Sequence, residues 1–272
     1  MNYRHAFHAG NFADCMKHAL LLWLLRAFAR KQSPFFVLDT HAGAGAYALE
    51  EGPAKLTGEW RRGIGLLLAN PPPALADYLG LVQRLGLYPG SPLLIRACLR
   101  EGDRLACCEL HPEDVALLRA RFVHDRQVGV HARDGYEALR ALLPPREGRG
   151  LVLIDPPFED PEEYDHLLKA LRGTFKRFRH GVYAVWYPIK HRAPVRAFHT
   201  MLAESGIRDI LAAELVLREP TDPTRLNGSG LVVINPPFRF EEEASVILSA
   251  LLERLGTGEA GAGVRLVRLA DE

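Results

Sequence analysis

The amino-acid sequence predicts an α/β protein built around a doubly wound, mostly parallel β-sheet of the Rossmann-like type. Short, almost continuous apolar runs recur along the 272 residues, and stretches with apolar residues near i, i+3, i+4 and i+7 lie between them. The apolar runs are FFVLD (35–39), LACCEL (105–110), VGVHA (128–132), LVLID (151–155), VYAVWY (182–187), DILAAELVL (209–217) and LVVIN (231–235). The helix-like stretches include HPEDVALLRARF, EYDHLLKALRGTFKRF and PVRAFHTMLAESG. Apolar strands that alternate with helices are typical of a parallel sheet covered on both faces.

One segment interrupts this alternation. Between residues 52 and 100 the chain contains NPPPALADYLGLVQRLG and YPGSPLLIRACLR, which suggest helices with proline-rich joints and no convincing strand. We interpret this segment as a small helical insertion after the first strand and its turn, because so short a piece buries little surface by itself. The predicted division is a main domain of residues 1–51 and 101–272, with a lid at its amino end, and an insertion of residues 52–100.

The last apolar runs are expected to reverse direction. LVVIN follows DILAAELVL after the loop REPTDPTRLNGSG, which suits a hairpin, so LVVIN should be antiparallel to its neighbours. Residues 256–263 (GTGEAGAG) form a flexible turn before a possible final strand, VRLVRLA.

Composition excludes several classes of protein. The net charge is +1, so any binding of nucleic acid requires a local basic face. The polar, histidine-rich start does not resemble a secretory signal, and the apolar run 19–25 is far shorter than the ~20 residues that a bilayer requires. We therefore expect a cytoplasmic protein with no membrane contact. The four cysteines lack CxxC spacing and the histidines lack an HExxH arrangement, so we expect buried thiols and no metal.

A tight glycine turn follows the first apolar run. After FFVLD the chain continues THAGAGAY, so Gly43 and Gly45 come soon after Asp39, the last residue of the run. Glycines let the backbone approach a ligand closely, and the turn after the first strand is where doubly wound folds bind nucleosides. The sequence therefore predicts a nucleoside site at this turn.

Acidic residues after the next two strands complete the predicted adenosine site. Glu109 stands where an acid binds ribose hydroxyls, and Asp134, followed by Gly135, stands where an acid can bind an adenine amino group. NAD and S-adenosylmethionine both carry an adenosine. The turn lacks the third glycine of the GxGxxG motif, which binds a pyrophosphate. S-adenosylmethionine contains no pyrophosphate, so the missing glycine favours it over NAD.

Two similar segments, LVLIDPPF (151–158) and LVVINPPF (231–238), raise the question of which one carries chemistry. A side-chain oxygen of Asp155 and the carbonyl of Pro156 could accept both hydrogens of an exocyclic amine on a base, and Phe158 offers a face on which a flipped base can stack. The fourth strand of a doubly wound sheet lies beside the first, so Asp155 should emerge next to the glycine turn. Asn235 should lie at the opposite edge of the sheet and be structural.

The DPPF motif resembles the [DNS]-PP-[YFW] motif of S-adenosylmethionine-dependent amino methyltransferases, and the whole chain is similar to one family of them, the RlmJ family. That family methylates an adenine of large-subunit ribosomal RNA. The resemblance rests on MNYRHAFHAGNFADCMKH, LDTHAGAGAY, DPPFE, VYAVWYPIKH and NGSGLVVINPP, and it covers nearly the whole chain. Phe158 stands where many members of the wider class have tyrosine; it keeps the stacking face and loses a hydroxyl group.

The resemblance implies a site and a substrate. The implied cofactor ligands are His18, His41, Gly43, Ser91, Glu109, Asp134, Gly135 and Asp155, and the implied catalytic residues are Asp155, Pro156 and Phe158. The implied RNA contacts are Tyr3, Arg4, Asn11 and Lys17. The implied product is N6-methyladenine at adenine 2030 of 23S ribosomal RNA, formed on free RNA and not on the assembled ribosome. We expect the enzyme to be a monomer.

The amino-terminal residues are expected to form the lid over this pocket. A polar segment that includes His5, His8, Lys17 and His18 precedes an amphipathic helix predicted at 19–28, which would pack on the sheet. Basic residues for RNA phosphates could come from Arg61-Arg62, Lys176-Arg177-Arg179 or Lys190-His191-Arg192. Only the last of these runs follows a strand end at the pocket edge.

Two other functions remain open from the sequence. A methyltransferase acting on adenine or cytosine in DNA, or on a glutamine amide, would use the same chemistry, and an inactive nucleic-acid-binding homologue would keep the fold. No separate target-recognition domain of the DNA type is apparent, and the family-like amino terminus favours RNA. Intact Gly43, Glu109, Asp134 and Asp155 favour an active enzyme. Whether Asp155 also takes a proton is open, because an ordinary aspartate of pKa ~4 is a weak base.

Overall fold

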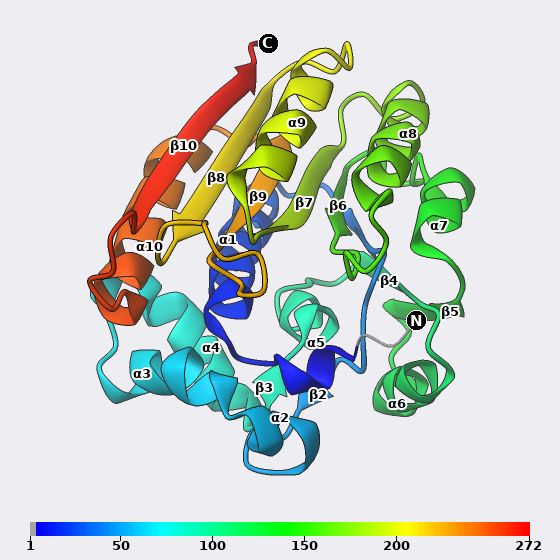
Figure 1. The fold of residues 1–272 in the computed structure, drawn as a ribbon. Coiled ribbons are helices and arrows are strands. Elements are labelled where there is room, and N and C mark those ends of the chain that lie inside the picture. Colours follow the sequence, from blue (N-terminus) through cyan, green and yellow to red (C-terminus); the bar gives the residue numbers. More distant parts are fainter. Residues whose placement is uncertain (1–3) are drawn as a thin grey trace.

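The computed structural model describes residues 4–272, which form an eight-stranded mixed sheet with helices on both faces (Figure 1). The strands lie in the order β10-β8-β9-β7-β6-β1-β4-β5. They are β1 (Phe36–Asp39), β4 (Arg104–Glu109), β5 (Val128–Ala132), β6 (Gly150–Ile154), β7 (Val182–Ile189), β8 (Ile210–Val216), β9 (Gly228–Ile234) and β10 (Gly263–Ala270). β5, β4, β1, β6 and β7 are parallel, so the predicted doubly wound α/β fold is confirmed.

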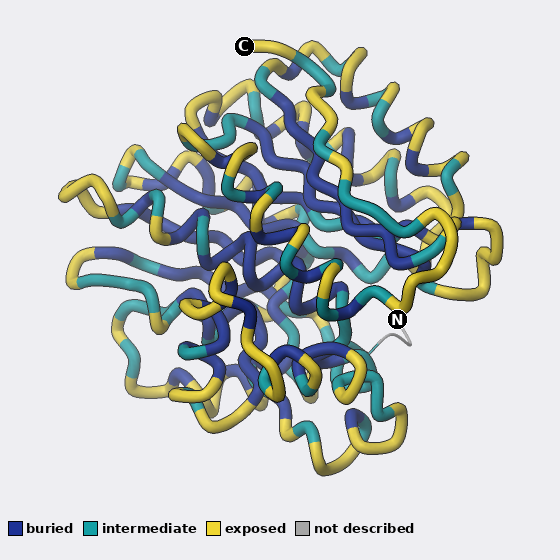
Figure 2. Tube along the Cα trace, turned by 90° about the vertical axis from the view of Figure 1, so that its left-hand side faces the viewer, coloured by how far each residue is buried: buried dark blue, intermediate teal, exposed yellow. Residues whose placement is uncertain are grey.

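Helices bury the apolar strands from both sides. The helices are α1 (Phe12–Ala29), α2 (Gly52–Thr57), α3 (Ile64–Ala69), α4 (Ala76–Leu85), α5 (Ser91–Arg96), α6 (Pro112–Phe122), α7 (Gly135–Leu142), α8 (Glu163–Phe175), α9 (Arg192–Ala203) and α10 (Phe240–Leu255), with 3-10 turns η1 (His5–Phe7), η2 (Glu59–Arg62) and η3 (Pro73–Leu75). α7, α8 and α9 cover one face, and α1, α5, α6 and α10 cover the other. Figure 2 shows the buried strands between these layers. No helix among residues 4–272 is long and apolar enough to cross a membrane.

The helix predicted at 19–28 begins earlier and is less amphipathic than the sequence suggested. α1 starts at Phe12, because the side chain of Asn11 accepts hydrogen bonds from the backbone amides of Ala13 and Asp14 and so caps the helix. The helix is buried on most sides, since it packs against β9 and also against α4, α5 and α10. Lys17 and His18 therefore belong to α1 itself and not to a polar segment that precedes it.

The insertion contains one strand that the sequence analysis missed. Tyr88 and Pro89 form the two-residue strand β3, which pairs with β2 (Ala46–Tyr47). A strand this short is invisible to an analysis based on periodicity. The buried residues of α3 and α4 belong to the same hydrophobic cluster as most of α1 and as Val37 of β1. We propose on this basis that residues 52–100 are an insertion within one domain.

The two PPF segments lie at opposite ends of the strands, Asp155 at the carboxyl end of the parallel strands and Asn235 at their amino end. β6 pairs with β1 in parallel, so Asp155 follows a strand that lies beside the glycine turn. β9 is antiparallel to β7, with Ile234 opposite Tyr183, so Asn235 lies beside the start of β7. Its backbone φ is 53°, and its side-chain amide donates to the carbonyls of Arg179 (2.8 Å) and Gly181 (2.7 Å). Asn235 thus links the loop that follows β9 to the loop that precedes β7, which is the behaviour of a structural residue.

We expect the Asn235→Ala variant to lose about 2 kcal/mol of unfolding free energy, because two carbonyls lose their donor and alanine is strained at positive φ. Asn235→Gly should lose less, because glycine adopts this conformation freely. Urea denaturation of the three proteins measures both effects. Equal midpoints for Asn235→Ala and the wild type would contradict this role.

Candidate active site

A large cavity opens at the carboxyl end of the parallel strands. Its volume is about 1050 Å³, and a smaller cavity of about 100 Å³ adjoins it and shares His41, Glu109 and Pro157 with it. The predicted site residues that line one or both cavities are Asn11, Lys17, His18, His41, Gly43, Ser91, Glu109, Asp134, Gly135, Asp155, Pro156 and Phe158. Arg4 is outside the lining and forms an ion pair with Glu113 (2.9 Å). Tyr3 lies outside the described residues.

The glycine turn lets the end of β1 approach the end of β4. Gly43 has a φ of 60°, and its backbone amide donates to the Glu109 carboxylate at 2.7 Å. The other oxygen of Glu109 accepts from the amides of Leu110 and His111 at 2.8 Å. Glu109 therefore fixes the loop that follows β4, and the oxygen that accepts from Gly43 keeps acceptor capacity for a ligand.

The smaller cavity is formed where β1 approaches α7. One oxygen of Asp134 caps α7 by accepting from the Glu137 amide at 2.9 Å. A Cβ atom at Gly135 would lie 2.4 Å from the carbonyl oxygen of Thr40, so only glycine fits between these elements. Burial lowers the pKa of His41 to about 4, against the opposing effects of Asp155 and Asp134, so the ring is neutral near pH 7.

Asp39, at the end of β1, is a buried carboxylate with no hydrogen bond of normal geometry to the described residues. Its side chain is fully buried. Burial raises its pKa to about 7, with a further contribution from Asp155, while Ser91 and Lys17 oppose the shift. A buried acceptor without a partner is costly unless a ligand satisfies it. The sequence identified Asp39 only as the end of a strand.

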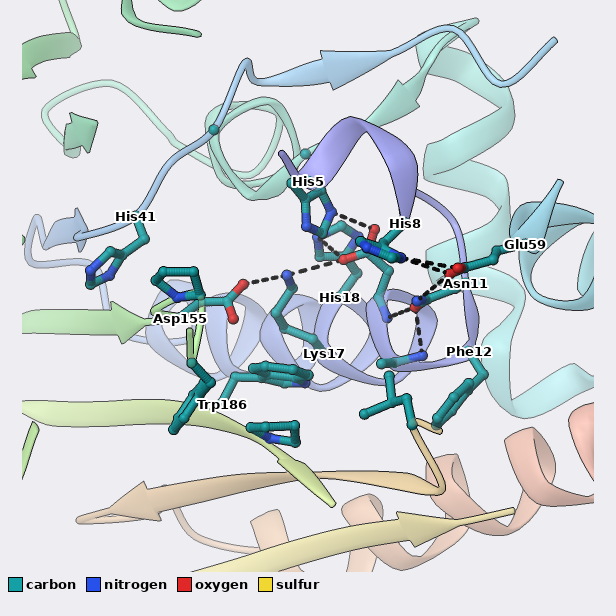
Figure 3. Close-up of a pocket in the computed structure, with 18 of the residues that line it drawn as sticks. His5, His8, Asn11, Phe12, Lys17, His18, His41, Glu59, Asp155 and Trp186 are labelled. Atoms are coloured by element: carbon teal, nitrogen blue, oxygen red, sulfur yellow. Dashed lines mark hydrogen bonds and ion pairs between the residues drawn. The ribbon is translucent and has the colours of Figure 1, made fainter. Parts of the chain in front are cut away.

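Lys17 connects α1 to the DPPF motif (Figure 3). Its ammonium lies 3.0 Å from Asp14 and 2.5 Å from Asp155, and the three side chains are 6%, 1% and 14% exposed. Burial opposes ionisation of Asp14, but His5 and Lys17 outweigh it and hold the pKa of Asp14 well below its usual range. The sequence predicted Lys17 as an RNA contact. In the structure its side chain is buried, and its ammonium forms an ion pair with Asp155.

The neighbouring residue on α1, His18, is neutral. Burial lowers its pKa to about 3, and its Nδ1 atom lies 3.1 Å from the hydroxyl oxygen of Tyr88 in the short strand β3. That hydroxyl is 3.1 Å from the hydroxyl of Tyr78 in α4. The insertion therefore supports the wall of the cavity from behind, through a chain of buried polar groups.

The turn before α1 is attached to the insertion through Glu59 in η2. Asn11 donates to Glu59 at 3.0 Å, and His8 contacts the same carboxylate at 3.0 Å. The hydrogen bond with Glu59 raises the pKa of His8. Asn11 thus lines the cavity, but its side-chain oxygen already caps α1 and its side-chain nitrogen already donates to Glu59.

Two aromatic side chains form the wall beside Asp155. Phe158 has a φ of 50° and packs on Tyr164, with ring centroids 5.0 Å apart, and on Trp186, with centroids 5.9 Å apart. Trp186 lines the same cavity and was not assigned from the sequence, although it lies in the quoted run VYAVWY. Asp14 was also missed, because its role depends on contacts with Lys17 and His5 that no local pattern shows.

The strand order, with β9 antiparallel between β7 and β8, and the cavity at the glycine turn are those of a class I, Rossmann-like methyltransferase fold. Residues 32–267 match the model of the family described as ribosomal RNA large subunit methyltransferase D, RlmJ. The chain belongs to this family.

Close relatives support this assignment over nearly the full length. The chain is 41% identical to ribosomal RNA large subunit methyltransferase J of Haemophilus influenzae, over 95% of this chain and 96% of that protein. It is also 41% identical to the Escherichia coli protein of the same name, over 96% and 97%. The crystal structure of protein LPL1258 from Legionella pneumophila superposes with a TM-score of 0.87 at 34% identity, over 96% of this chain and 98% of that one.

The raised pKa of Asp39 predicts a pH-dependent difference in stability between the wild type and Asp39→Asn. Between the unfolded pKa of 3.8 and the folded value of about 7, the folded state binds more protons, so wild-type stability should fall relative to the variant as pH rises. Above about pH 8 the difference should be constant. Denaturation curves from pH 4 to 8.5 measure it, and a difference that does not change with pH would contradict the buried, unpaired state of Asp39.

Removing Lys17 should leave two buried carboxylates facing each other. We expect Lys17→Met to cost about 3 kcal/mol of unfolding free energy, and Asp155→Asn to cost less in that background than in the wild type. The exposed Lys176, replaced by Met, is the control and should change stability by less than about 0.5 kcal/mol. Additive effects of Lys17→Met and Asp155→Asn would show that the two groups do not interact.

Proposed function

We propose that this chain is an S-adenosylmethionine-dependent methyltransferase that forms N6-methyladenine in 23S ribosomal RNA, at the position corresponding to adenine 2030. The observation that carries the proposal is the DPPF motif, which lies at the cavity beside the glycine turn with Asp155 held by the buried Lys17. The names of the two curated relatives and of the matching family support an RNA substrate of the large ribosomal subunit.

The residues around the glycine turn fit S-adenosylmethionine. Asp39 is a buried acceptor with no hydrogen bond of normal geometry to the described residues, and it ends the strand that leads into the glycine turn. We assign the adenosine to Glu109, Asp134, Gly135 and His41, and the amino-acid part to the region of His18, Gly43 and Ser91, with Asp39 as a further acceptor. When bound, S-adenosylmethionine supplies an electrophilic methyl group.

Asp155 and Pro156 would activate the adenine amine. The lone pair of N6 is delocalised into the ring, and two acceptors that bind both amino hydrogens favour a pyramidal nitrogen whose lone pair can attack. One oxygen of Asp155 is held by Lys17, which fixes the orientation of the carboxylate and leaves the other oxygen to accept an amino hydrogen. Phe158 and Trp186 provide aromatic surface on which the flipped base can stack. The methylated ammonium would then lose its proton to water.

Methyl transfer to an unmodified 23S ribosomal RNA transcript, followed by nucleoside mass spectrometry, tests the proposal. The wild type and Asn235→Gly should form N6-methyladenine, and Asp155→Ala should lower kcat by at least about 100-fold while still binding S-adenosylmethionine. Adenine-to-guanine replacement at the target should abolish the product. Methylation of DNA or of a glutamine peptide without methylation of RNA would contradict the proposed substrate, and failure to bind S-adenosylmethionine would favour an inactive homologue.

A further inference from the structure

Part of the large cavity lies beyond the glycine turn and DPPF motif, and it is lined by the end of β7 and by the loop between β8 and β9. This loop, residues 217–227, contributes Leu217, Arg218, Thr224, Arg225 and Leu226 to the lining. The antiparallel pairing of Gly228 with Ile189 brings the end of the loop next to the end of β7. The loop therefore lies at the same end of the strands as Asp155, although it comes from a distant part of the sequence (Figure 1).

Three cations from separate parts of the chain line this cavity. Arg62 comes from η2 in the insertion, Lys190 follows β7, and Arg225 comes from the β8–β9 loop. All three side chains are exposed, and no ion pair joins any of them to a carboxylate within residues 4–272. Glu59 and Glu259 also line the cavity, but they bind His8 and Arg218. Exposed cations that form no ion pair favour an anionic ligand.

The β8–β9 loop is held in a defined shape, so the position of Arg225 is fixed by the fold. Asn227 is fully buried, and its side-chain amide donates to the carbonyl of Lys190 (2.8 Å) and to that of Asp222 (2.7 Å). The Asp222 carboxylate accepts from the backbone amide of Thr224 at 2.9 Å. Asn227 therefore connects the two segments that carry Lys190 and Arg225.

The acidic residues near Arg225 have other partners. Glu259 accepts from Arg218 at 3.0 Å, and Arg218 also donates to the carbonyl of Leu226 at 3.2 Å. Arg218 is therefore engaged with Glu259 and the Leu226 carbonyl, whereas Arg225 is exposed and forms no ion pair within residues 4–272. This distinguishes two arginines of one loop that the sequence alone does not separate.

We propose that Arg62, Lys190 and Arg225 form a phosphate-binding rim that contacts the RNA backbone on either side of the target nucleotide. This proposal rests on the proposed function and deepens it. A base that enters the cavity as far as Asp155 leaves its flanking phosphates at the opening, where the three cations lie. Phosphate contacts set the register of a strand and carry no sequence information, so the rim would position the target base while the inner site selects it.

The structure also separates this rim from other basic runs. Arg62 and Lys190 belong to runs considered from the sequence, and Arg225 belongs to none of them. The run at Lys176 and Arg179 does not line the cavity. These two residues, together with Lys169 on α8, are exposed and provide a control triple variant with the same loss of charge.

The experiment compares the rim variant Arg62→Ala/Lys190→Ala/Arg225→Ala with the control variant Lys169→Ala/Lys176→Ala/Arg179→Ala. Both should bind S-adenosylmethionine as the wild type does, which verifies folding. On the unmodified 23S transcript, the rim variant should raise Kd and KM by about 100-fold, with kcat changed less than about threefold. The slope of log Kd against log salt should fall by about 2, as expected for three lost contacts to single-stranded phosphates. The control variant should stay within about threefold of the wild type.

The possible outcomes distinguish a failure of the phosphate-rim proposal from a failure of the proposed function. If the wild type methylates RNA and the rim variant matches the control in Kd and salt slope, the phosphate rim is wrong and the proposed function stands. If both triple variants lose affinity equally, general charge accounts for binding and the rim is again wrong. If the wild type neither binds nor methylates RNA while it binds S-adenosylmethionine, both the rim and the RNA substrate are overturned.

Discussion

The ion pairs of Lys17 with Asp14 and Asp155 are the interaction on which the rest of the site depends. Three charged groups with almost no exposure are tolerated only when each is paired, because desolvation of an unpaired charge costs several kcal/mol. Asp14 is paired further with His5 and accepts from the Gly10 amide. The DPPF carboxylate is therefore oriented only when α1 and the turn before it are packed in place on the sheet.

This dependence explains the position of the insertion. Glu59 binds His8 and Asn11, and Asn11 caps α1, so the insertion stabilises the start of the helix that carries Lys17. Tyr88 reaches the next residue of that helix, His18, from the short strand β3. Residues 52–100 thus share the core of the main sheet and also determine the position of a charged group beside the DPPF motif.

The two PPF segments, DPPF (155–158) and NPPF (235–238), make different contacts although their sequences are almost the same. Asp155 follows a parallel strand at the edge where β1 ends in the glycine turn, and it meets Lys17 there. Asn235 follows an antiparallel strand and lies at the opposite end of the strands, where its amide donates to the carbonyls of a neighbouring loop. An amide can donate to carbonyls, as Asn235 does, whereas an ionised carboxylate cannot donate and pairs with a cation, as Asp155 does with Lys17.

The sequence by itself determined the doubly wound fold, the position of the glycine turn and the placement of Asp155, and not Asn235, beside that turn. These depend on local signals, namely continuous apolar strands, glycines directly after the first of them, and a hairpin loop before the last PPF segment. Only the tertiary structure decided that Lys17 is buried against Asp155, that Asp39 has no hydrogen bond of normal geometry to the described residues, and that Arg225 joins Arg62 and Lys190 at the cavity. Each of these facts arises from contacts between segments far apart in the chain, and burial and pairing, which no local pattern encodes, determine what a charged side chain can do.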